Sequence, residues 1–383
     1  MKNLKILHLA NDEKFIDQAF KAFEQIAPGK NYLYLISKEK PKLVKSQAKI
    51  ISNLQAMTCP PQKGLLNHDI IVIHSLNPDW FNIIKKFPKD KVLIWLGWGY
   101  DYYDILHESG SELLLPLTKK AWKEAPQKES LITKSKNTLK KLLSPVKKQS
   151  IIKRIDIFAP VLPSEYGMVK EKFLPEKFPK QAIWNYGNLE DDLVKGFTEE
   201  KVTGNAILVG NSASAENNHI DSFALLSNLK IGSRKVISPL SYGNQKYRDL
   251  VLNEGRKQLG NQFIALTEFM PISEYVSILK TCSFVIMNHM RQQAVGNIVI
   301  MLYLGAKVFL QKDCPTFTFF KQQGAKIFSI QELEQSPSLL NQKLDEKSQA
   351  INKEIVIENW SREVSNGKTQ RLLEQAYQIK NER

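Results

Sequence analysis

The stretch between residues 288 and 298 joins polar side chains and an arginine at a place suited to anion binding. It follows a predicted strand that ends at Met287 and leads into an apolar helix that we expect to end at Leu304, before Gly305. The first turn of a helix offers unpaired backbone N–H groups and a partial positive charge, both of which favour a diphosphate. Arg291 adds a fork of donors that matches phosphate oxygens. The alternative is an ordinary turn with a surface arginine.

Polar residues also follow two earlier predicted strands in the same half of the chain. Gly210, Asn211 and Ser212 end one strand, where glycine permits close approach of the backbone and the two polar side chains supply donors to phosphate or hydroxyl groups. The alternative for this segment is a turn with a helix N-cap. The turn after the next strand carries two tyrosines that we expect to frame the same pocket, Tyr242 and Tyr247. His219, in a polar segment before a helix, either contacts the diphosphate or is exposed.

The first half of the chain offers three candidate proton acceptors. Asp12 follows the first predicted strand, and Asp101 follows another, so both carboxylates are expected at the edge where ligands bind. His74, at the end of a third strand, is a further candidate base. A base in this position would remove the proton of an attacking hydroxyl group. The alternative for each aspartate is a helix N-cap.

Motifs spread over roughly residues 70 to 310 resemble one family of transferases. Residues 291–296 read Arg-Gln-Gln-Ala-Val-Gly, residues 209–212 read Val-Gly-Asn-Ser with His219-Ile220 downstream, and residues 98–101 read Trp-Gly-Tyr-Asp. A weaker match is His74 with Asn77-Pro78. In this order they resemble the TDP-N-acetylfucosamine:lipid II N-acetylfucosaminyltransferase (4-alpha-L-fucosyltransferase) family. The resemblance implies a glycosyltransferase of the GT-B fold that uses a nucleotide-sugar donor, with no cofactor and no metal ion.

The resemblance also suggests roles for residues of the second half. Glu268 would accept a ribose hydroxyl group and Phe269 would read the base, although a solvated glutamate at a strand end is the alternative. Many GT-B enzymes bind the ribose through a glutamate, but Gln293 and Ile300 stand at the two corresponding positions here. The expected donor-site residues are Gly210, Asn211, Ser212, His219, Tyr242, Glu268, Phe269, Arg291, Gln292, Gln293, Gly296 and Asn297.

Strands and helices alternate along the chain in two series, which indicates parallel βαβ units. The first series of apolar runs comprises residues 4–10, 31–36, 69–74, 91–96 and 155–161. The second predicts five strands, at residues 206–212, 235–240, 263–266, 283–287 and 306–310. We therefore expect two Rossmann-like α/β domains that face a cleft. Residues 1–188 would bind the acceptor, residues 189–350 would bind the nucleotide sugar, and residues 351–383 would form a helical tail.

The charge is concentrated in one segment. Of the net charge of +15, a charge of +10 lies in residues 119–154, which hold eleven Lys and one Arg against two Glu. Leucine and isoleucine residues alternate with these lysines, so the segment fits an anionic membrane surface. The alternatives are a solvated loop and nucleic-acid binding. The three cysteines have no paired spacing, which argues against a disulfide framework or a zinc site.

The sequence thus predicts an enzyme that moves an amino-deoxyhexose, 4-acetamido-4,6-dideoxygalactose, from a TDP-sugar to a lipid-linked oligosaccharide. No apolar run is long enough to span a bilayer, so we expect a peripheral protein on the inner face of the bacterial inner membrane. One alternative is a GT-B enzyme that uses another UDP- or TDP-sugar in O-antigen or capsule assembly. The other is a non-catalytic basic protein that binds membranes or nucleic acid.

Overall fold

The chain forms two compact units in the computed structural model, which describes residues 4–37, 39–52, 63–107, 109–125, 147–173, 177–229 and 231–383. Unit 1 comprises Met1–Leu106, Gln127–Asn188 and Arg362–Arg383. Unit 2 comprises His107–Pro126 and Leu189–Ser361. Each unit is described separately below.

Unit 1 is built on a seven-stranded parallel sheet with the order β3-β2-β1-β4-β5-β6-β7. The strand order changes direction between β1 and β4, which creates the switch point at which open parallel sheets bind ligands. The strands are β1 (Ile6–Asn11), β2 (Asn31–Ile36), β3 (Ala48–Ile51), β4 (Ile70–His74), β5 (Val92–Leu96), β6 (Ile157–Ala159) and β7 (Lys180–Gln181). All residues of β4 and β5 are buried, as expected for central parallel strands that are covered on both faces.

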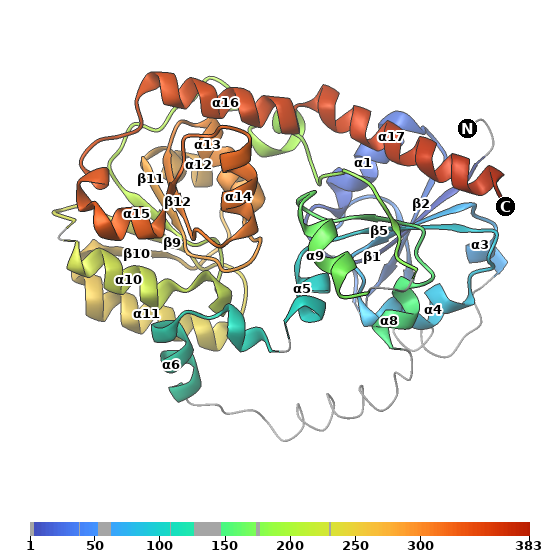
Figure 1. Ribbon diagram of the computed structural model, residues 1–383, viewed down its shortest axis with the longest axis horizontal. Helices are drawn as coiled ribbons and strands as arrows, with labels where there is room; N and C mark the ends of the chain where they lie inside the picture. The colour runs from blue at the N-terminus through green and yellow to red at the C-terminus, as the bar shows by residue number, and fades with distance from the viewer. Residues whose placement is uncertain are drawn as a thin grey trace. The chain divides into compact units, whose positions relative to one another are not determined.

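Helices cover the sheet of unit 1, and Figure 1 shows the last helix of the chain lying beside the first one. The helices are α1 (Ile16–Ile26), α3 (Lys63–Leu66), η1 (Pro78–Trp80), α4 (Phe81–Lys86), α5 (Tyr100–Leu106), α8 (Lys148–Ile152), α9 (Glu165–Glu171) and α17 (Arg362–Asn381). One cluster of buried side chains joins Phe23 of α1 to Leu372, Leu373 and Ala376 of α17 and to the strands. The C-terminal helix therefore completes the core of unit 1.

Unit 2 has a six-stranded parallel sheet with the order β10-β9-β8-β11-β12-β13 and a switch point between β8 and β11. The strands are β8 (Ile207–Val209), β9 (Val236–Pro239), β10 (Phe263–Leu266), β11 (Phe284–Met287), β12 (Lys307–Leu310) and β13 (Phe328–Ser329). Open parallel sheets of this kind bind their ligands beyond the carboxyl ends of the strands, near the switch point.

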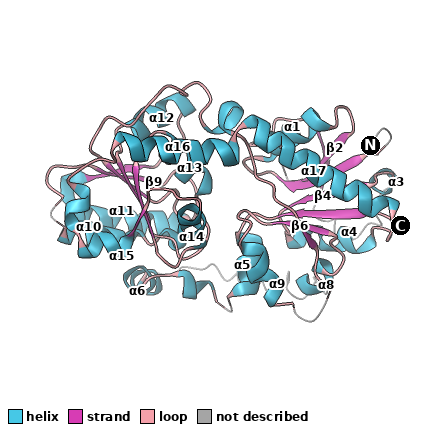
Figure 2. Ribbon diagram, turned by 45° about the horizontal axis from the view of Figure 1, so that its top comes forward, coloured by secondary structure: helices cyan, strands magenta, loops and turns pink. Residues whose placement is uncertain are grey.

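Figure 2 shows the sheet of unit 2 between two layers of helices. The helices are η2 (Gly110–Leu113), α6 (Pro116–Glu124), η3 (Leu189–Leu193), η4 (Ala215–Asn217), α10 (His219–Asn228), α11 (Gln245–Leu259), η5 (Gly260–Gln262), α12 (Ile272–Lys280), α13 (Val295–Tyr303), α14 (Pro315–Gln322), α15 (Ile330–Gln335), η6 (Pro337–Leu340) and α16 (Glu346–Trp360). Buried side chains of α10, α11 and α15 share one core with the strands. Helix α13 is apolar on almost every face, because the sheet and α16 both cover it.

The fold class predicted from the sequence is confirmed, and all ten predicted strands exist. The prediction of five strands in the second sheet is wrong by one, because β13 completes that sheet. Strands β3, β7 and β13 escaped the sequence analysis because they are short strands at sheet edges, with two to four residues each. Such strands carry too few apolar residues to stand out from loops.

Two segments belong to a different unit from the residues that precede them. Residues 107–126 were expected within the first domain, but they are part of unit 2. The reason is visible in the described contacts, because Asp221 of α10 accepts the backbone N–H groups of Leu117 and Thr118, and Trp122 packs on Tyr247. Likewise the helical tail is two helices, of which α16 belongs to unit 2 and α17 to unit 1.

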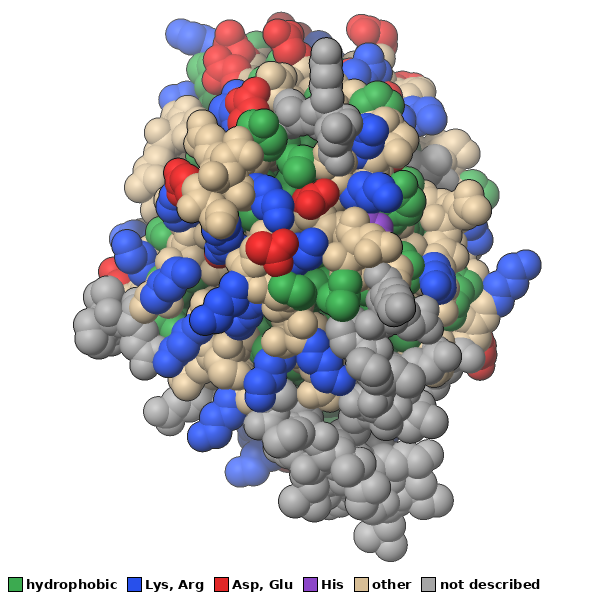
Figure 3. Space-filling model, turned by 90° about the vertical axis from the view of Figure 1, so that its right-hand side faces the viewer, with side chains coloured by type: hydrophobic (Ala, Val, Ile, Leu, Met, Phe, Trp, Pro, Cys, Tyr) green, Lys and Arg blue, Asp and Glu red, His purple; other side chains and the backbone are tan. Residues whose placement is uncertain are grey.

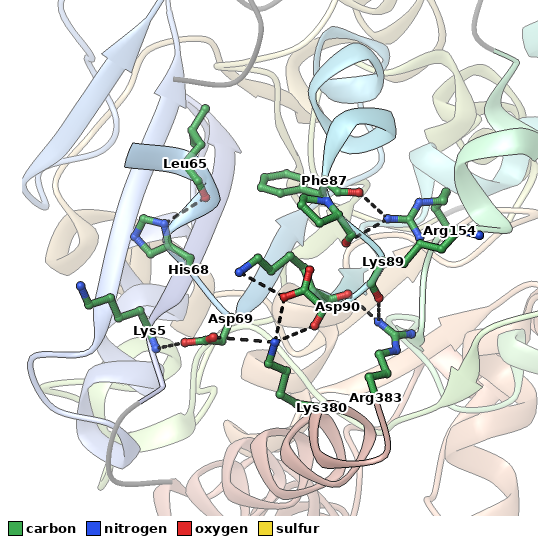
Figure 4. Close-up of polar contacts among 12 residues, drawn as sticks. Lys5, Leu65, His68, Asp69, Phe87, Lys89, Asp90, Arg154, Lys380 and Arg383 are labelled. Carbon is green, nitrogen blue, oxygen red and sulfur yellow. Dashed lines mark hydrogen bonds and ion pairs between the residues drawn. The ribbon is translucent and has the colours of Figure 1, made fainter. Parts of the chain in front are cut away.

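Ion pairs fix the end of α17 at the amino edge of the sheet of unit 1 (Figure 4). Lys380 Nζ lies 3.1 Å from Asp90 Oδ2 and 3.9 Å from Asp69 Oδ1. Arg383 donates to the carbonyl groups of Lys89 and Lys91 at 2.8 and 2.6 Å and pairs with Asp156, whose side chain is buried. The helix is thus held by buried apolar residues along its length and by charges at its end.

We expect Arg383→Ala to lower the free energy of unfolding by about 1–2 kcal/mol, because it removes the cation paired with a buried carboxylate and a donor to two carbonyl groups. Chemical denaturation would measure this. Arg371→Ala on the same helix is the matched control, and an equal loss in both variants would contradict the role given to the Arg383 contacts.

Candidate functional site

Three loops meet at the carboxyl edge of the sheet of unit 2, and they carry most of the predicted donor-site residues. Asn211 Nδ2, after β8, donates to Tyr242 Oη, after β9, at 3.0 Å. Gln293 Nε2, after β11, donates to Asn211 Oδ1 at 3.2 Å. The backbones after β8 and β9 also pair directly, through Ala213 and Gly243. The structure therefore brings Asn211, Tyr242 and Gln293 into one hydrogen-bonded row beside the switch point.

The buried amide of Asn217 holds these loops together. Its Oδ1 accepts the backbone N–H of Asn211 at 2.9 Å and the Nε2–H of His289 at 2.8 Å. Its Nδ2 donates to Ser212 Oγ at 3.3 Å and to Ser214 O at 3.2 Å. Asn217 is not among the site residues predicted from the sequence. Its place in a run of polar residues gave no sign that the side chain would be fully buried.

His219 is buried under Gly210, although an exposed histidine was one expectation for this segment. A Cβ atom on Gly210 would lie 2.6 Å from His219 Nε2 and 2.8 Å from Asn217 Oδ1, so only glycine fits here. Gly210 also has a φ of +68°, which glycine adopts without strain. Burial lowers the pKa of His219 to about 3, so the ring is neutral, and Nε2 has no hydrogen-bond partner among the described residues. The close approach expected at this glycine is thus made by a histidine of the protein itself.

Arg291, which is buried, forms an ion pair with the half-buried Glu216. Its Nε and Nη2 lie 2.6 and 2.5 Å from Glu216 Oε2, and its Nη1 donates to the carbonyl group of Gln292 at 2.6 Å. Both nitrogens thus contact one carboxylate oxygen, and such charge-assisted hydrogen bonds are short and orient the guanidinium group. The predicted contact of Arg291 with a phosphate stays a prediction. A phosphate at this place would compete with Glu216 for the guanidinium group.

The first turn of α13 has the geometry expected of an anion site. Ala294, its N-cap residue, has a left-handed backbone with a φ of +58° and no side-chain cap. Gly296 and Asn297 lie in this turn, and Asn297 is hydrogen-bonded to Tyr275 of α12. Gln293 Oε1, just before the helix, is buried without a hydrogen-bond partner among the described residues. A hydroxyl group of a ligand could donate a hydrogen bond to Gln293 Oε1 and so give this buried oxygen a partner.

Glu268 and Phe269 lie outside the hydrogen-bonded row. Both residues are exposed, and 66% of the surface of Phe269 is accessible. Their predicted contacts with ribose and base stay predictions. Within the described ranges, no three His, Cys, Asp or Glu side chains gather closely enough to hold a metal ion.

Asp101 ties together two strand ends at the carboxyl edge of unit 1. Its buried carboxylate accepts the backbone N–H groups of Leu76 and Trp98, both at 2.7 Å, and the indole N–H of Trp95 at 2.6 Å. Burial raises the pKa of Asp101, and the three donors only partly oppose this shift. Because two of these donors belong to the backbone after β4 and β5 and the third to a buried side chain of β5, the structure gives Asp101 a positioning role. Its action as a base stays a prediction.

Asp12 organises a different loop. Its carboxylate accepts the backbone N–H groups of Lys42, Leu43 and Val44 at 2.7, 3.0 and 2.9 Å. Burial opposes ionisation, but the three N–H groups outweigh it and hold the pKa of Asp12 below its usual value. A carboxylate stabilised in this way is a weak proton acceptor, and the predicted role of Asp12 as a base remains untested.

His74 belongs to a buried chain of hydrogen bonds whose direction is fixed. Asn31 Nδ2 donates to Glu24 and Ala27, so its Oδ1 must accept from His8 Nε2, at 3.1 Å. His8 Nδ1 then accepts from His74 Nε2, at 3.0 Å, and His74 Nδ1 accepts from Tyr186 Oη, also at 3.0 Å. Burial lowers the pKa of His8 to about 4 and that of His74 well below its ordinary value.

The last donor of this chain is an indole. Trp98 Nε1 donates to Tyr186 Oη at 2.6 Å, so the chain of neutral groups orients the ring of Trp98 at the carboxyl edge of the sheet. Both ring nitrogens of His74 are used inside the chain. The structure thus gives His74 a role in placing Trp98, while its predicted role as a base stays untested.

One acidic residue at this edge was missed. Glu13 follows Asp12 directly in the sequence, and its Oε1 accepts the hydroxyl group of Tyr100 at 3.2 Å. Burial raises the pKa of Glu13, and the Tyr100 hydroxyl only partly opposes this. Its position just after β1 was a signal for a site residue, but Asp12 has the same position. The sequence pattern alone therefore could not show which of the two carboxylates is available to a ligand.

Comparison with known proteins decides the family. Residues 174–365 match the family described as 4-alpha-L-fucosyltransferase, glycosyl transferase group 56. The chain belongs to this family. It is therefore a glycosyltransferase, as the motifs at Gly210 and Arg291 predicted, and the matched residues include nearly all of the second series of strands and helices.

Solved structures share the fold of this group 56 transferase at low sequence identity. A glycosyltransferase from Rickettsia africae superposes with a TM-score of 0.59 at 16% identity, over 99% of each chain. Sucrose-phosphate synthase from Thermosynechococcus elongatus gives a TM-score of 0.61 at 11% identity, over 98% of this chain and 99% of the other. Trehalose 6-phosphate synthase from Burkholderia multivorans gives 0.62 at 7% identity, over 98% and 97%. These likenesses establish the GT-B fold.

Gly210→Ala tests the close packing of His219. The matched control is Gly232→Ala, because Gly232 has nearly the same φ, +67°, but open space where a Cβ would lie. We expect the control to lose about 1 kcal/mol of unfolding free energy through backbone strain. Gly210→Ala should lose about 1–3 kcal/mol more through overlap, as measured by chemical denaturation. Equal losses would contradict the packing argument.

Arg291→Ala and Glu216→Ala separate ligand binding from structural support. If Arg291 contacts the diphosphate of the donor, Arg291→Ala should weaken TDP binding about 10- to 100-fold, because a charged hydrogen-bond donor is lost. Glu216→Ala should leave binding equal or tighter, because it removes the competing carboxylate. Isothermal calorimetry would measure both. If the two variants lose affinity equally, the ion pair only supports the loop.

Proposed function

We propose that this transferase moves 4-acetamido-4,6-dideoxygalactose from its TDP donor to an undecaprenyl-diphosphate-linked oligosaccharide during synthesis of a bacterial surface polysaccharide. The family description, a fucosyltransferase, supports a deoxyhexose donor. The motifs at residues 98–101, 209–212 and 291–296 support the more specific substrate. The observation that carries the proposal is the meeting of Asn211, Tyr242 and Gln293 at the switch point of unit 2.

The donor site would work by stabilising the leaving group. As the acceptor oxygen bonds to the anomeric carbon, the bond to the phosphate oxygen breaks and its electron pair leaves with TDP. The free N–H groups of the first turn of α13 would receive the developing negative charge, together with Arg291. This source of positive charge is the basis for proposing that the reaction needs no metal ion.

Gln293 would replace the glutamate that many GT-B enzymes use to bind the donor. An amide oxygen accepts a hydrogen bond from a hydroxyl group as a carboxylate does, but it carries no charge. Gln293 Oε1 is buried and has no partner among the described residues, while its Nε2 is fixed by Asn211. We therefore assign this oxygen to a hydroxyl group of the donor.

The membrane part of the proposal rests on residues 119–154. Residues 126–146 of this segment lie outside the described residues. Its described flanks carry the exposed side chains of Lys119, Lys120 and Lys153. Figure 3 shows one face of unit 1 with many Lys and Arg side chains, which suits an anionic lipid surface. No helix in the described part of the chain has the length and apolar character of a membrane span.

Calorimetric titration with TDP, UDP and GDP, first without metal and then with Mg²⁺, tests this proposal. We expect TDP to bind more tightly than UDP and GDP, and Mg²⁺ to change its Kd less than twofold. Tighter binding of UDP than of TDP would favour the alternative function, a GT-B enzyme that uses another nucleotide sugar in O-antigen or capsule assembly. Binding of none of the three would overturn the proposed donor site.

A further inference from the structure

Exposed aromatic rings gather at the carboxyl edge of unit 1, beside the switch point between β1 and β4. Phe15 is 43% exposed and Tyr100 is 44% exposed, although both are large and largely apolar. The ring of Trp98 lies between them, with centroid distances of 6.0 Å to Phe15 and 6.4 Å to Tyr100. Neighbouring exposed aromatic side chains are an unfavourable surface for water, and such patches mark binding sites.

The backbone at this edge is strained in the same place. Phe15 and Ser75 are two of the four non-glycine residues with a positive φ among the described residues, at +72° and +66°. Left-handed backbone costs about 1 kcal/mol or more in residues with a side chain, and it persists where a site requires it. Phe15 is the N-cap of α1, which follows β1, and Ser75 directly follows β4, so the two strained residues lie after the two strands that flank the switch point.

Glu13 is the acidic group of this edge that is left available. Asp12 accepts three backbone N–H groups, and Asp101 accepts two backbone N–H groups and the indole N–H of Trp95. Glu13 accepts only the hydroxyl group of Tyr100 from the described residues, at Oε1, and its Oε2 accepts none. Tyr100 Oη also lies 2.9 Å from Ser75 Oγ, which keeps the phenol in place.

We propose that this edge is the acceptor-sugar subsite, in which Phe15, Trp98 and Tyr100 receive one face of a hexopyranose ring and Glu13 is the catalytic base. This inference rests on the proposed function, because the subsite would bind the acceptor of the proposed sugar transfer. One face of a hexopyranose presents C–H bonds with partial positive charge, which complement the negative face of an aromatic ring. As the acceptor oxygen bonds to the anomeric carbon and the phosphate leaves, the hydroxyl proton passes to Glu13 Oε2.

Charges around Glu13 support this role. The groups that face it are Tyr100 from α5 and the carboxylates of Asp101 and Asp12, with Lys14 next in sequence. Burial and these two negative neighbours raise the pKa of Glu13 above its ordinary value of 4.5, which strengthens the carboxylate as a proton acceptor. The base form is lost as the pH falls through that raised pKa. The rate should therefore decline on the acid side.

Glu13→Gln tests the base, with Glu39→Gln as the matched control on an exposed glutamate of the same unit. We expect kcat for sugar transfer from the TDP donor to fall at least about 100-fold in Glu13→Gln. TDP affinity should stay within twofold, and the acid limb of kcat/KM should disappear from the remaining activity. Activity within threefold of the control, or a retained acid limb, would overturn the assignment.

A second measurement needs neither donor nor turnover. Saturation-transfer NMR with methyl N-acetyl-α-glucosaminide should show contact of its ring protons with the wild type and with the control Tyr32→Ala, an exposed aromatic residue at the opposite edge. Phe15→Ala should reduce the signal about tenfold. Phe15→Gly should do the same, and it also relieves the left-handed backbone, so misfolding would not account for the loss. No signal from the wild type, or an unchanged signal in both Phe15 variants, would overturn the subsite.

The two proposals fail in different ways. The proposed TDP site consists of unit 2 residues. If TDP does not bind, the proposed donor is wrong, but the NMR result for the glycoside is not affected. If TDP binds but the glycoside does not contact Phe15, the donor site survives and the acceptor subsite is wrong.

Discussion

The side-chain amide of Asn217 is the contact on which the loops of unit 2 depend. It is fully buried, and its oxygen and nitrogen together bind groups from the loop after β8 and from the loop after β11. A buried amide must have all of these partners, since each one left unpaired would cost about 1–3 kcal/mol. The row from Tyr242 through Asn211 to Gln293 can therefore hold its geometry before any ligand binds. Such preorganisation is how a site stabilises a developing charge without rearranging.

Unit 1 meets the same requirement with a carboxylate. Asp101 gathers three N–H groups from the ends of β4 and β5, and the chain from Asn31 to Tyr186 orients the indole of Trp98 from below. The acidic side chains at this edge thus differ in whether they hold the backbone. Asp101 does, whereas Glu13 accepts only the Tyr100 hydroxyl group from the described residues, and Phe15 and Tyr100 add exposed rings at the same edge.

The sequence predicted the architecture well, because long runs of buried β-branched residues such as those of β4 and β5 are a strong signal. It also located the strand ends, which is why Asn211, Gln293 and Asp101 were selected. It could not distinguish Asp12 from Glu13, because the difference lies in whether residues 42–44, thirty positions away, donate to the carboxylate. It could not show that His219 is buried or that Arg291 is paired with Glu216, since both depend on contacts between loops from different strands. Local pattern thus identifies the edge of the sheet, and tertiary contacts decide which atoms remain free there.

The placement of α17 has a consequence for how the protein is made. Its residues Leu372, Leu373 and Ala376 fill the core of unit 1, which otherwise consists of residues from the first half of the chain. During synthesis, every residue of unit 2 leaves the ribosome before this helix does. The unit that is started first is therefore finished last, and part of its apolar core stays uncovered until the twenty residues of α17 emerge.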